Sequence, residues 1–595
     1  MFLKKISGYL FEKWEITLVF IVFIVFCATR LMMFGNHFTH YDDIFGPYLI
    51  KLINSYDQEY FIYQVQKYGS SLGPNIQGFV ITYFVENDLL FDLIKRMIGA
   101  FSISIVSTFA PIQFIFTALI LNFDLAYPDF IKVMRLPSLI FALGSFGMMI
   151  LFSNLFDDSL KKVFLICGST LLTVSWMSII YSSQSENFIL GLFSVFILFF
   201  IIQKIHKNQL SLLHSVYLGL ILSILCFSHY QVMFFLPGFY LGYLFAANKQ
   251  KFWPRFASLI PAGLINLVSV AIIYFVFLST RLGVNPGVHW NAGLNNEFVW
   301  QTVYLENGLL ESLFNIIYFF FINSIKVLYG IFGFRDSFDL FSILSALFLF
   351  IFSLIGLYKL SKSHQFRHLF IFIILTIIVW MILIFMQKLT LSPTRHSLVL
   401  IPLIITLFVF GISEMFSQFK FLKNFKNIFL FSFCIINIFV FIGSYKNIYD
   451  QRTNPFLSDV NIINVIEKYN ISKIAAYGYT GDINFFPEIN LKFDINWSNQ
   501  FPFTYVINSK KEFSNKNQDS TVMILCANSE ICGNTLAEEL ALQELGFLSN
   551  SEAELLKPLF SFEADSNVTN GFSNMAGSGT RRIFLKVYGE TINSQ

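Results

Sequence analysis

The sequence predicts a polytopic α-helical membrane protein of about eleven spans, followed by a C-terminal α/β domain outside the membrane. Three observations lead to this prediction. Hydrophobic residues make up 55% of the chain and charged residues only 13%, against roughly 25% charged residues in an ordinary soluble domain. The mean hydropathy is +0.63, and long apolar runs recur through residues 1–445. Residues 446–595 instead have a mixed composition with short alternating runs.

Eleven apolar runs have the length of roughly 17–25 residues that a membrane helix requires. They are residues 16–34, 137–156, 163–181, 187–203, 213–229, 232–247, 257–279, 339–358, 369–387, 397–416 and 428–445. Two further runs, 98–121 and 311–334, are also long enough, but polar or helix-breaking residues interrupt them. Pro111 lies in the first, and Asn323 and Lys326 lie in the second.

The distribution of Lys and Arg between the apolar runs predicts which runs cross the membrane and which connections face the cytoplasm. The run after Lys13 can span and has no small-residue cleavage site after it, so we expect a cytoplasmic N-terminus. Eleven spans then place the short basic connections on the cytoplasmic side. These connections contain Lys161, Lys162, Lys204, Lys207, Lys249, Lys251, Arg255, Lys359, Lys362, Arg367, Lys420, Lys423 and Lys426. If 98–121 and 311–334 both crossed, this pattern would be lost, so we expect them to lie on the outer surface as amphipathic or re-entrant helices.

This topology predicts a plasma (inner) membrane protein with three outer segments, residues 35–136, 280–338 and 446–595. The last is expected to be an extracytoplasmic α/β domain, separate from a membrane domain of residues 1–445. Its expected strands are residues 473–477, 521–525 and 582–586, and residues 536–556 have a helical pattern. Cys526 and Cys532 also lie in this tail, where they could form a disulfide or remain free thiols.

An acidic pair, Asp42-Asp43, follows the first apolar run directly. Two adjacent carboxylates are too costly to bury, so they must face water, a cation or a substrate. Capping a helix or loop is the structural alternative. Other chemistries have no motif here: the chain lacks a phosphate-binding loop, an H-E-x-x-H pair and a G-x-S-x-G elbow. Ionisable residues are nearly confined to the ends of the runs, which disfavours an ion-coupled transporter.

Four patterns, in this order, resemble the GT-C glycosyltransferases of the protein O-mannosyltransferase and lipid A aminoarabinose transferase type. They are the acidic pair Asp42-Asp43, the Thr-Phe-Ala-Pro-Ile of 108–112, the Met-Arg-Leu-Pro-Ser-Leu-Ile-Phe-Ala-Leu of 134–143, and the Thr-Arg-His-Ser-Leu-Val-Leu-Ile-Pro of 394–402. In this family the second pattern opens a surface helix, and the third and fourth enter spans. The resemblance covers about the first 450 residues.

The resemblance implies an inverting glycosyltransferase that uses a polyprenyl-phosphate sugar at the outer face of the membrane. Asp42 is the expected general base, and Asp43 its partner or the ligand of an optional divalent metal. Arg395, Arg135 and Lys67 are the expected contacts of the donor phosphate, with Arg395 favoured over Arg135. Snorkelling to the lipid headgroups is the alternative role for either arginine. The implied partners are the lipid-linked donor, a lipid, glycan or protein acceptor and membrane lipids, with no nucleic acid.

Two other classes share the predicted architecture. A flippase or carrier would bind lipid-linked sugars without making a bond, and internal pseudo-repeats would favour it. No such repeats are visible in the sequence. An oligosaccharide polymerase or ligase would place its main functional loop late in the chain, whereas the acidic pair lies in the first outer segment.

Overall fold

The computed structural model describes most of the apolar runs and part of the tail. The described residues are 14–34, 110–120, 129–184, 187–246, 252–278, 309–332, 340–386, 389, 391, 395–419, 422, 424–452, 462–471, 473–478, 493–497, 503–510, 521–527, 559–566 and 581–589. The chain divides into two units, which we describe separately. The first includes Arg135–Tyr445 and the second includes Lys446–Gln595.

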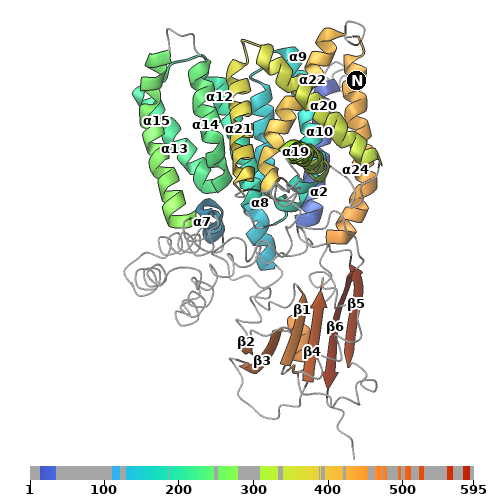
Figure 1. The fold of residues 1–595 in the computed structure, drawn as a ribbon. Coiled ribbons are helices and arrows are strands. Elements are labelled where there is room, and N and C mark those ends of the chain that lie inside the picture. Colours follow the sequence, from blue (N-terminus) through green and yellow to red (C-terminus); the bar gives the residue numbers. More distant parts are fainter. Residues whose placement is uncertain are drawn as a thin grey trace, which may run out of the picture. The chain divides into compact units, whose positions relative to one another are not determined.

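The first unit is a bundle of apolar helices (Figure 1). Its elements are α2 (Trp14–Phe34), α7 (Pro111–Ile120), α8 (Asp129–Ser153), α9 (Asp158–Val163), η3 (Phe164–Gly168), α10 (Ser169–Val174), α11 (Trp176–Ser182), α12 (Phe188–Ile205), α13 (Leu212–Ser228), η4 (Tyr230–Phe235), α14 (Leu236–Phe245), α15 (Phe252–Ile272), η6 (Ile273–Leu278), α19 (Leu309–Phe332), α20 (Leu340–Lys362), α21 (Arg367–Phe385), η8 (Arg395–Leu400), α22 (Ile401–Gln418) and α24 (Lys426–Arg452). Within the described residues, nine helices are long and apolar enough to cross a membrane. This is the architecture of a polytopic helical membrane protein.

The helices correspond to the predicted runs, with two local differences. One of the nine is α19, the run predicted not to cross. The predicted span 163–181 is bent by 62° between Val174 and Trp176, and α13 has only 17 residues. The segment formed by η4 and α14 matches the predicted span 232–247. Eight of the nine helices, the bent pair, α13 and this segment thus match the eleven predicted runs in position, and the number of spans stays a prediction.

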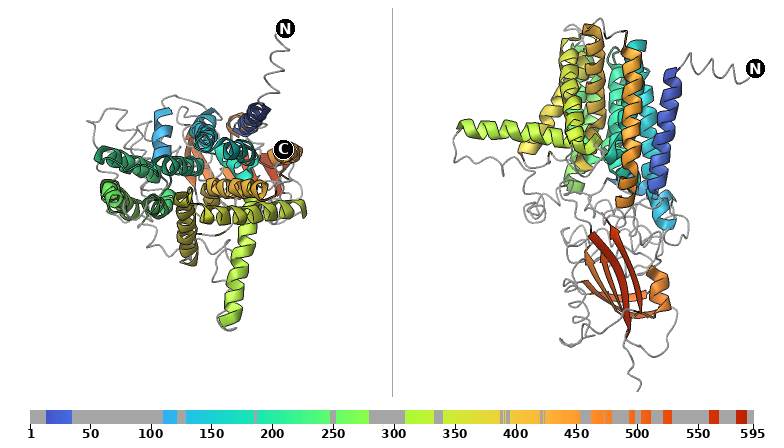
Figure 2. Two further views of the ribbon diagram at one scale, coloured as in Figure 1. Left: turned by 90° about the horizontal axis from the view of Figure 1, so that it is seen from above. Right: turned by 90° about the vertical axis from the view of Figure 1, so that its right-hand side faces the viewer.

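The two runs expected on the surface are described in part, and their place at a membrane surface stays a prediction. In both views of Figure 2, α19 runs crosswise to the neighbouring helices and not alongside them. The α7 helix has 10 residues, too few to cross a bilayer, and it begins at Pro111 as predicted. Proline suits the first helical position because its missing N–H would have no partner there. Residues 98–109 lie outside the described part of the chain.

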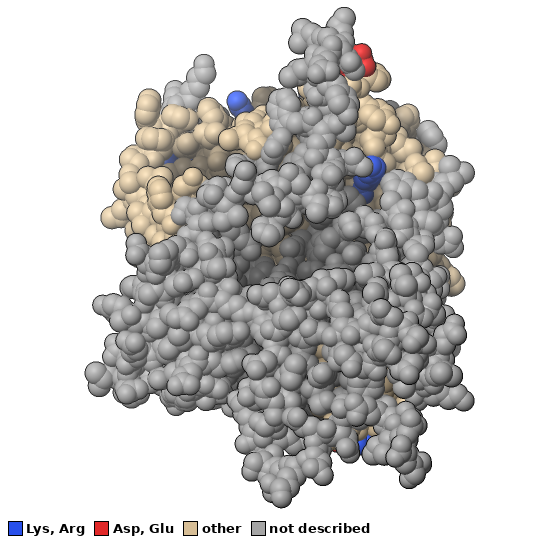
Figure 3. Space-filling model, turned by 60° about the horizontal axis from the view of Figure 1, so that its bottom comes forward, with Lys and Arg blue, Asp and Glu red and all other residues tan. Residues whose placement is uncertain are grey.

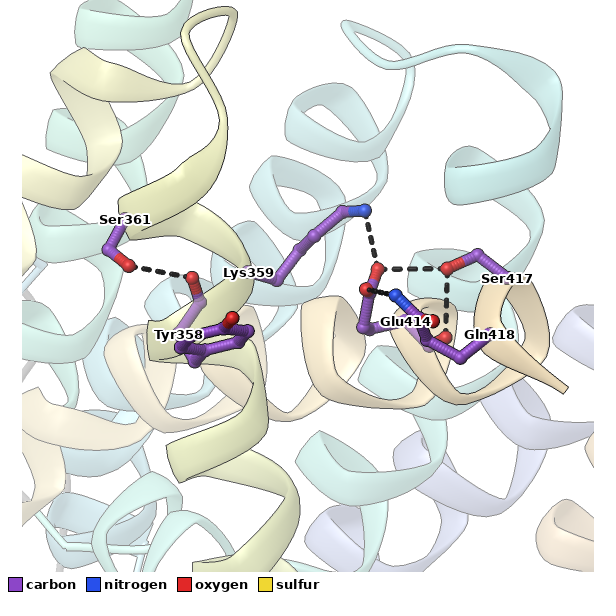
Figure 4. Close-up of polar contacts among 6 residues, drawn as sticks. All are labelled: Tyr358, Lys359, Ser361, Glu414, Ser417 and Gln418. Atoms are coloured by element: carbon purple, nitrogen blue, oxygen red, sulfur yellow. Dashed lines mark hydrogen bonds and ion pairs between the residues drawn. The ribbon is translucent and has the colours of Figure 1, made fainter.

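The basic helix ends gather at one end of the bundle, which we call the basic end. Ion pairs and hydrogen bonds join them there: Lys162 contacts Glu15 at 3.3 Å, and the Lys426 ammonium donates to Ser159 Oγ at 2.8 Å. Lys359 forms an ion pair with Glu414, which also accepts hydrogen bonds from Ser417 and Gln418 (Figure 4). Figure 3 brings the bottom of the view in Figure 1 forward; most of the surface visible there belongs to residues outside the description, and few of the described side chains in view are charged. The described basic residues are therefore grouped as the sequence predicts, and Lys249, Lys251, Lys420 and Lys423 lie outside the described residues.

Helix α13 packs against α15 through small residues and a buried polar network. A Cβ atom on Gly219 would lie 2.9 Å from the Ala262 Cα atom, so the two backbones are close. The buried Asn266 amide donates to the Gly219 carbonyl and to Ser223 Oγ, each at 2.8 Å, and its oxygen accepts from the Tyr240 hydroxyl. Small residues and interhelical hydrogen bonds are the usual source of helix association in lipid.

We expect Asn266→Leu to destabilise the folded protein by about 0.6–2 kcal/mol, because it removes three interhelical hydrogen bonds. Thermal unfolding in detergent would measure the change. Asn437→Leu is the matched control, since Asn437 donates only to the Phe433 carbonyl of its own helix. Equal losses in the two variants would show that the interhelical network contributes nothing.

The second unit contains a mixed six-stranded sheet and the helix α26 (Ile462–Lys468). Its strands are β1 (Lys473–Gly478), β2 (Phe493–Trp497), β3 (Phe503–Lys510), β4 (Thr521–Ala527), β5 (Phe560–Ser566) and β6 (Arg581–Gly589), in the spatial order β2-β3-β1-β4-β6-β5. Among the described strands, only β1 and β4 pair in parallel. The three predicted strands are confirmed as β1, β4 and β6. Residues 536–556 and Cys532 lie outside the described residues.

Candidate functional site

The structure describes two of the five predicted site residues. Asp42, Asp43 and Lys67 lie outside the described part of the chain. Arg395 begins η8, but its side chain is outside the description. Arg135 is described in full within α8. Among the described residues no group of three His, Cys, Asp or Glu could hold a metal ion, and the expected metal ligand Asp43 is not among them. The catalytic pair and its optional metal therefore stay predictions.

The environment of Arg135 corrects two expectations. Helix α8 begins at Asp129 and continues through Pro137, whereas the sequence predicted a span starting at Pro137. Proline within a membrane helix is tolerated because neighbouring groups can satisfy the freed backbone. Arg135 consequently lies inside the helix, and its side chain is fully buried. It does not snorkel to a water-exposed position.

Helix α7 is joined to α8 near this arginine. The buried Gln113 amide donates to Ser138 Oγ at 3.3 Å, and the rings of Phe116 and Phe141 meet edge to face at 5.3 Å. Gln113 is a polar residue within the apolar run 98–121. It therefore joins helix α7 to helix α8. This contact joins α7 to the third family-like pattern, residues 134–143.

Arg30 is a buried cation that the sequence analysis missed. It lies near the C-terminal end of α2, and its side chain is fully buried. One terminal nitrogen donates to the Leu172 carbonyl and to Ser178 Oγ, each at 3.0 Å, and the other to the Thr173 carbonyl at 3.4 Å. Its guanidinium also lies 3.5 Å from the centre of the Phe26 ring. The signal in the sequence was an arginine inside an otherwise apolar run.

The contacts of Arg30 explain the bend between α10 and α11. At the break, the carbonyls of the last turn of α10 lose their helical donors, and Arg30 supplies replacements. Ser175 begins α11 by accepting from the Ser178 amide at 3.3 Å. Its hydroxyl also donates to the Ile331 carbonyl of α19 at 3.1 Å. The bend therefore connects α2 to the crosswise helix.

A second buried polar group lies where α12, η4 and η8 meet. The Phe188 ring is flanked edge to face by His229 at 5.2 Å and by His396 at 5.6 Å. The Gln231 amide nitrogen lies 3.3 Å from His396 Nδ1. A Cβ atom on Gly191 would lie 2.8 Å from both His229 and Val399, so glycine is required for this close packing. We call Phe188, His229, Gln231 and His396 the imidazole group.

Two amide oxygens near this group have no hydrogen-bond partner within the described structure. They belong to Gln184, which follows α11, and to Gln231, and both side chains are buried. An unsatisfied buried oxygen costs about 1–3 kcal/mol, so each would gain from a donor such as a hydroxyl. Helices are interrupted in the same stretches of the chain, at Ser175, at His229 and at η8. These stretches thus combine buried polar groups with interrupted helices.

Comparison with known proteins assigns no family or function to this chain. No family model matches this chain, and no curated protein or solved structure matches it. The resemblance to GT-C glycosyltransferases therefore depends on the four sequence patterns.

Proposed function

We propose that this protein is an inverting GT-C-type glycosyltransferase that moves a sugar from a polyprenyl-phosphate donor to a lipid, glycan or protein acceptor at the outer face of the membrane. The observation that supports the proposal is a set of buried polar groups, Gln184 and the imidazole group, on segments where helices are interrupted. Helices are interrupted at Ser175 and at His229. By the positive-inside rule the end of the bundle opposite the basic end faces outward.

The chemistry of such a donor suits this end of an apolar bundle. A polyprenyl chain stays in the lipid, so transfer must occur where the hydrocarbon region ends. The exposed sides of the spans are apolar and can contact such a chain, for example at Phe20 and Ile24 of α2. Polar groups at the end of the spans can then contact the sugar and the phosphate. The buried oxygens of Gln184 and Gln231 offer acceptors for sugar hydroxyls.

The proposed reaction assigns a role to each predicted residue. Asp42 accepts the proton of the acceptor hydroxyl while its oxygen attacks the anomeric carbon from the face opposite the phosphate. The bond from that carbon to the phosphate oxygen breaks, and polyprenyl phosphate leaves with the electron pair. Arg395, with Arg135 and Lys67, would stabilise the departing phosphate. Asp43 would orient Asp42 or hold an optional divalent metal.

Arg30 does not make a carrier the better proposal. A charged residue within a span is by default a candidate for transport. In this structure, however, its donors go to the carbonyls of Leu172 and Thr173 and to a serine hydroxyl. These contacts stabilise a bent helix, and their acceptors are two backbone carbonyls and a hydroxyl, not carboxylates. We therefore assign Arg30 a structural role.

Turnover in detergent separates the proposed enzyme from a carrier, because a micelle has no two sides across which to move a lipid. Purified protein should convert a radiolabelled polyprenyl-phosphate monosaccharide into free polyprenyl phosphate and a glycosylated product when acceptor extract is present. The acceptor and sugar would come from mass analysis of surface glycans in cells with and without the protein. Transfer only from an oligosaccharide on polyprenyl diphosphate would indicate a ligase. Donor movement in vesicles without any product would indicate a carrier.

A further inference from the structure

Two buried histidines stack face to face near the basic end, far along their helices from the proposed catalytic end. The rings of His206 and His368 lie 3.7 Å apart and are nearly parallel, at 8°. His206 follows α12, and His368 lies in the first turn of α21. Gln203 holds both: its carbonyl lies 2.6 Å from His206 Nδ1, and its amide oxygen lies 2.6 Å from His368 Nε2.

A buried arginine lies next to this stack. The Arg255 side chain is 4% exposed and donates to the Tyr243 carbonyl at 3.1 Å, at the end of α14. Its Nε atom has no hydrogen-bond partner within the described part of the chain. The Tyr243 hydroxyl in turn donates to the Asn208 carbonyl at 2.8 Å, which joins α14 to the loop that carries Lys207. We call His206, Lys207, Arg255 and His368 the cationic cluster.

The cluster has no acidic residue to balance it among the described residues. The positive charges of Lys207 and Arg255 act on both imidazoles. Burial lowers the pKa of His206, and these two charges lower it further, although the hydrogen bond with the Gln203 carbonyl opposes them. No carboxylate contributes to either histidine. By contrast, Lys359 and Lys162 at the same end are each paired with a glutamate.

We propose that the cationic cluster binds the phosphate of an anionic phospholipid headgroup, with Arg255 and Lys207 as the direct contacts. A buried guanidinium without a carboxylate is stabilised by an anion, and a phosphate accepts several charge-assisted hydrogen bonds at once. Basic sites between membrane helices on the cytoplasmic side are suited to acidic lipids. This inference does not depend on the proposed catalytic function.

The surface beside Arg255 favours a lipid over a free anion. Trp253 and Phe256, in the same first turns of α15, are 72% and 44% exposed. Ile260 extends this exposed apolar surface by one more turn. Aromatic residues at the ends of spans lie at the level of the lipid headgroups. A phospholipid could therefore place its phosphate at Arg255 and its acyl chains along α15.

Native mass spectrometry of the full-length protein in detergent can test this site. Titration with phosphatidylglycerol should show a first bound lipid with an apparent dissociation constant at least about tenfold below that of phosphatidylcholine. Arg255→Gln and Lys207→Gln should each remove most of this preference. Lys207 is exposed, so its variant tests the site even if Arg255→Gln does not fold. Lys362→Gln is the matched control, because this exposed lysine is at the same end but outside the cluster.

Three results would overturn the inference. The preference could survive in both cluster variants, or it could fall equally in Lys362→Gln, which would indicate attraction to the whole basic end. Inorganic phosphate could also compete with the bound phosphatidylglycerol at millimolar concentration, which would assign the cluster to a free anion instead of a lipid.

Discussion

Replacing Asp42 by asparagine is expected to lower sugar transfer by about 10²–10⁴-fold, the usual contribution of a well-placed general base. The substitution keeps the size of the side chain and much of its hydrogen-bonding capacity. It removes the negative charge that accepts the proton of the attacking hydroxyl. Release of radiolabelled sugar from polyprenyl phosphate by purified protein measures the effect.

The neighbouring residues provide the controls for this experiment. Asp43→Asn should also lower turnover, whereas Arg395→Ala should mainly raise the KM for the donor by removing a phosphate contact. Unchanged thermal unfolding would show that the Asp42→Asn protein is folded. Near-normal turnover by a folded Asp42→Asn protein would leave the acidic pair as a helix or loop cap and would assign the general base to another residue.

Alanine at Gly356 or Gly411 is expected to destabilise the bundle by roughly 1–3 kcal/mol or more, because α20 and α22 cross in contact at these two glycines. A Cβ atom on Gly356 would overlap the Leu407 carbonyl, and one on Gly411 would overlap the Phe352 carbonyl. Backbone atoms cannot rotate away as a side chain can, so the two helices must separate. Thermal unfolding in detergent would detect the loss.

Gly263→Ala is the matched control for the two helix-crossing variants. Gly263 is also within a helix, and no atom lies within 4 Å of a Cβ atom built there. Alanine at that position should stabilise the helix by about 0.5–1 kcal/mol through its higher helix propensity. If alanine changed the thermal stability equally at Gly263, Gly356 and Gly411, the close crossing of α20 and α22 would be excluded as the cause of the loss.

The sequence by itself determined the membrane class, the places of the apolar helices and three strands of the tail. Hydropathy is a property of local composition, because a helix in lipid satisfies its own backbone and needs only enough apolar residues. The alternation of basic connections likewise predicted which helix ends lie together. Pro111 marked the start of α7 because the limits that proline imposes on the backbone are local.

Only the tertiary structure decided what the polar residues within the apolar runs do. Arg30 was missed because its partners, Leu172, Thr173 and Ser178, are far away in the sequence. The same holds for His206 and His368, which stack only because α12 and α21 lie side by side. The burial of Arg135 also depended on where α8 begins, eight residues before Pro137. A polar group in lipid must find a partner, and which partner it finds is set by how the helices pack, not by its neighbours in the chain.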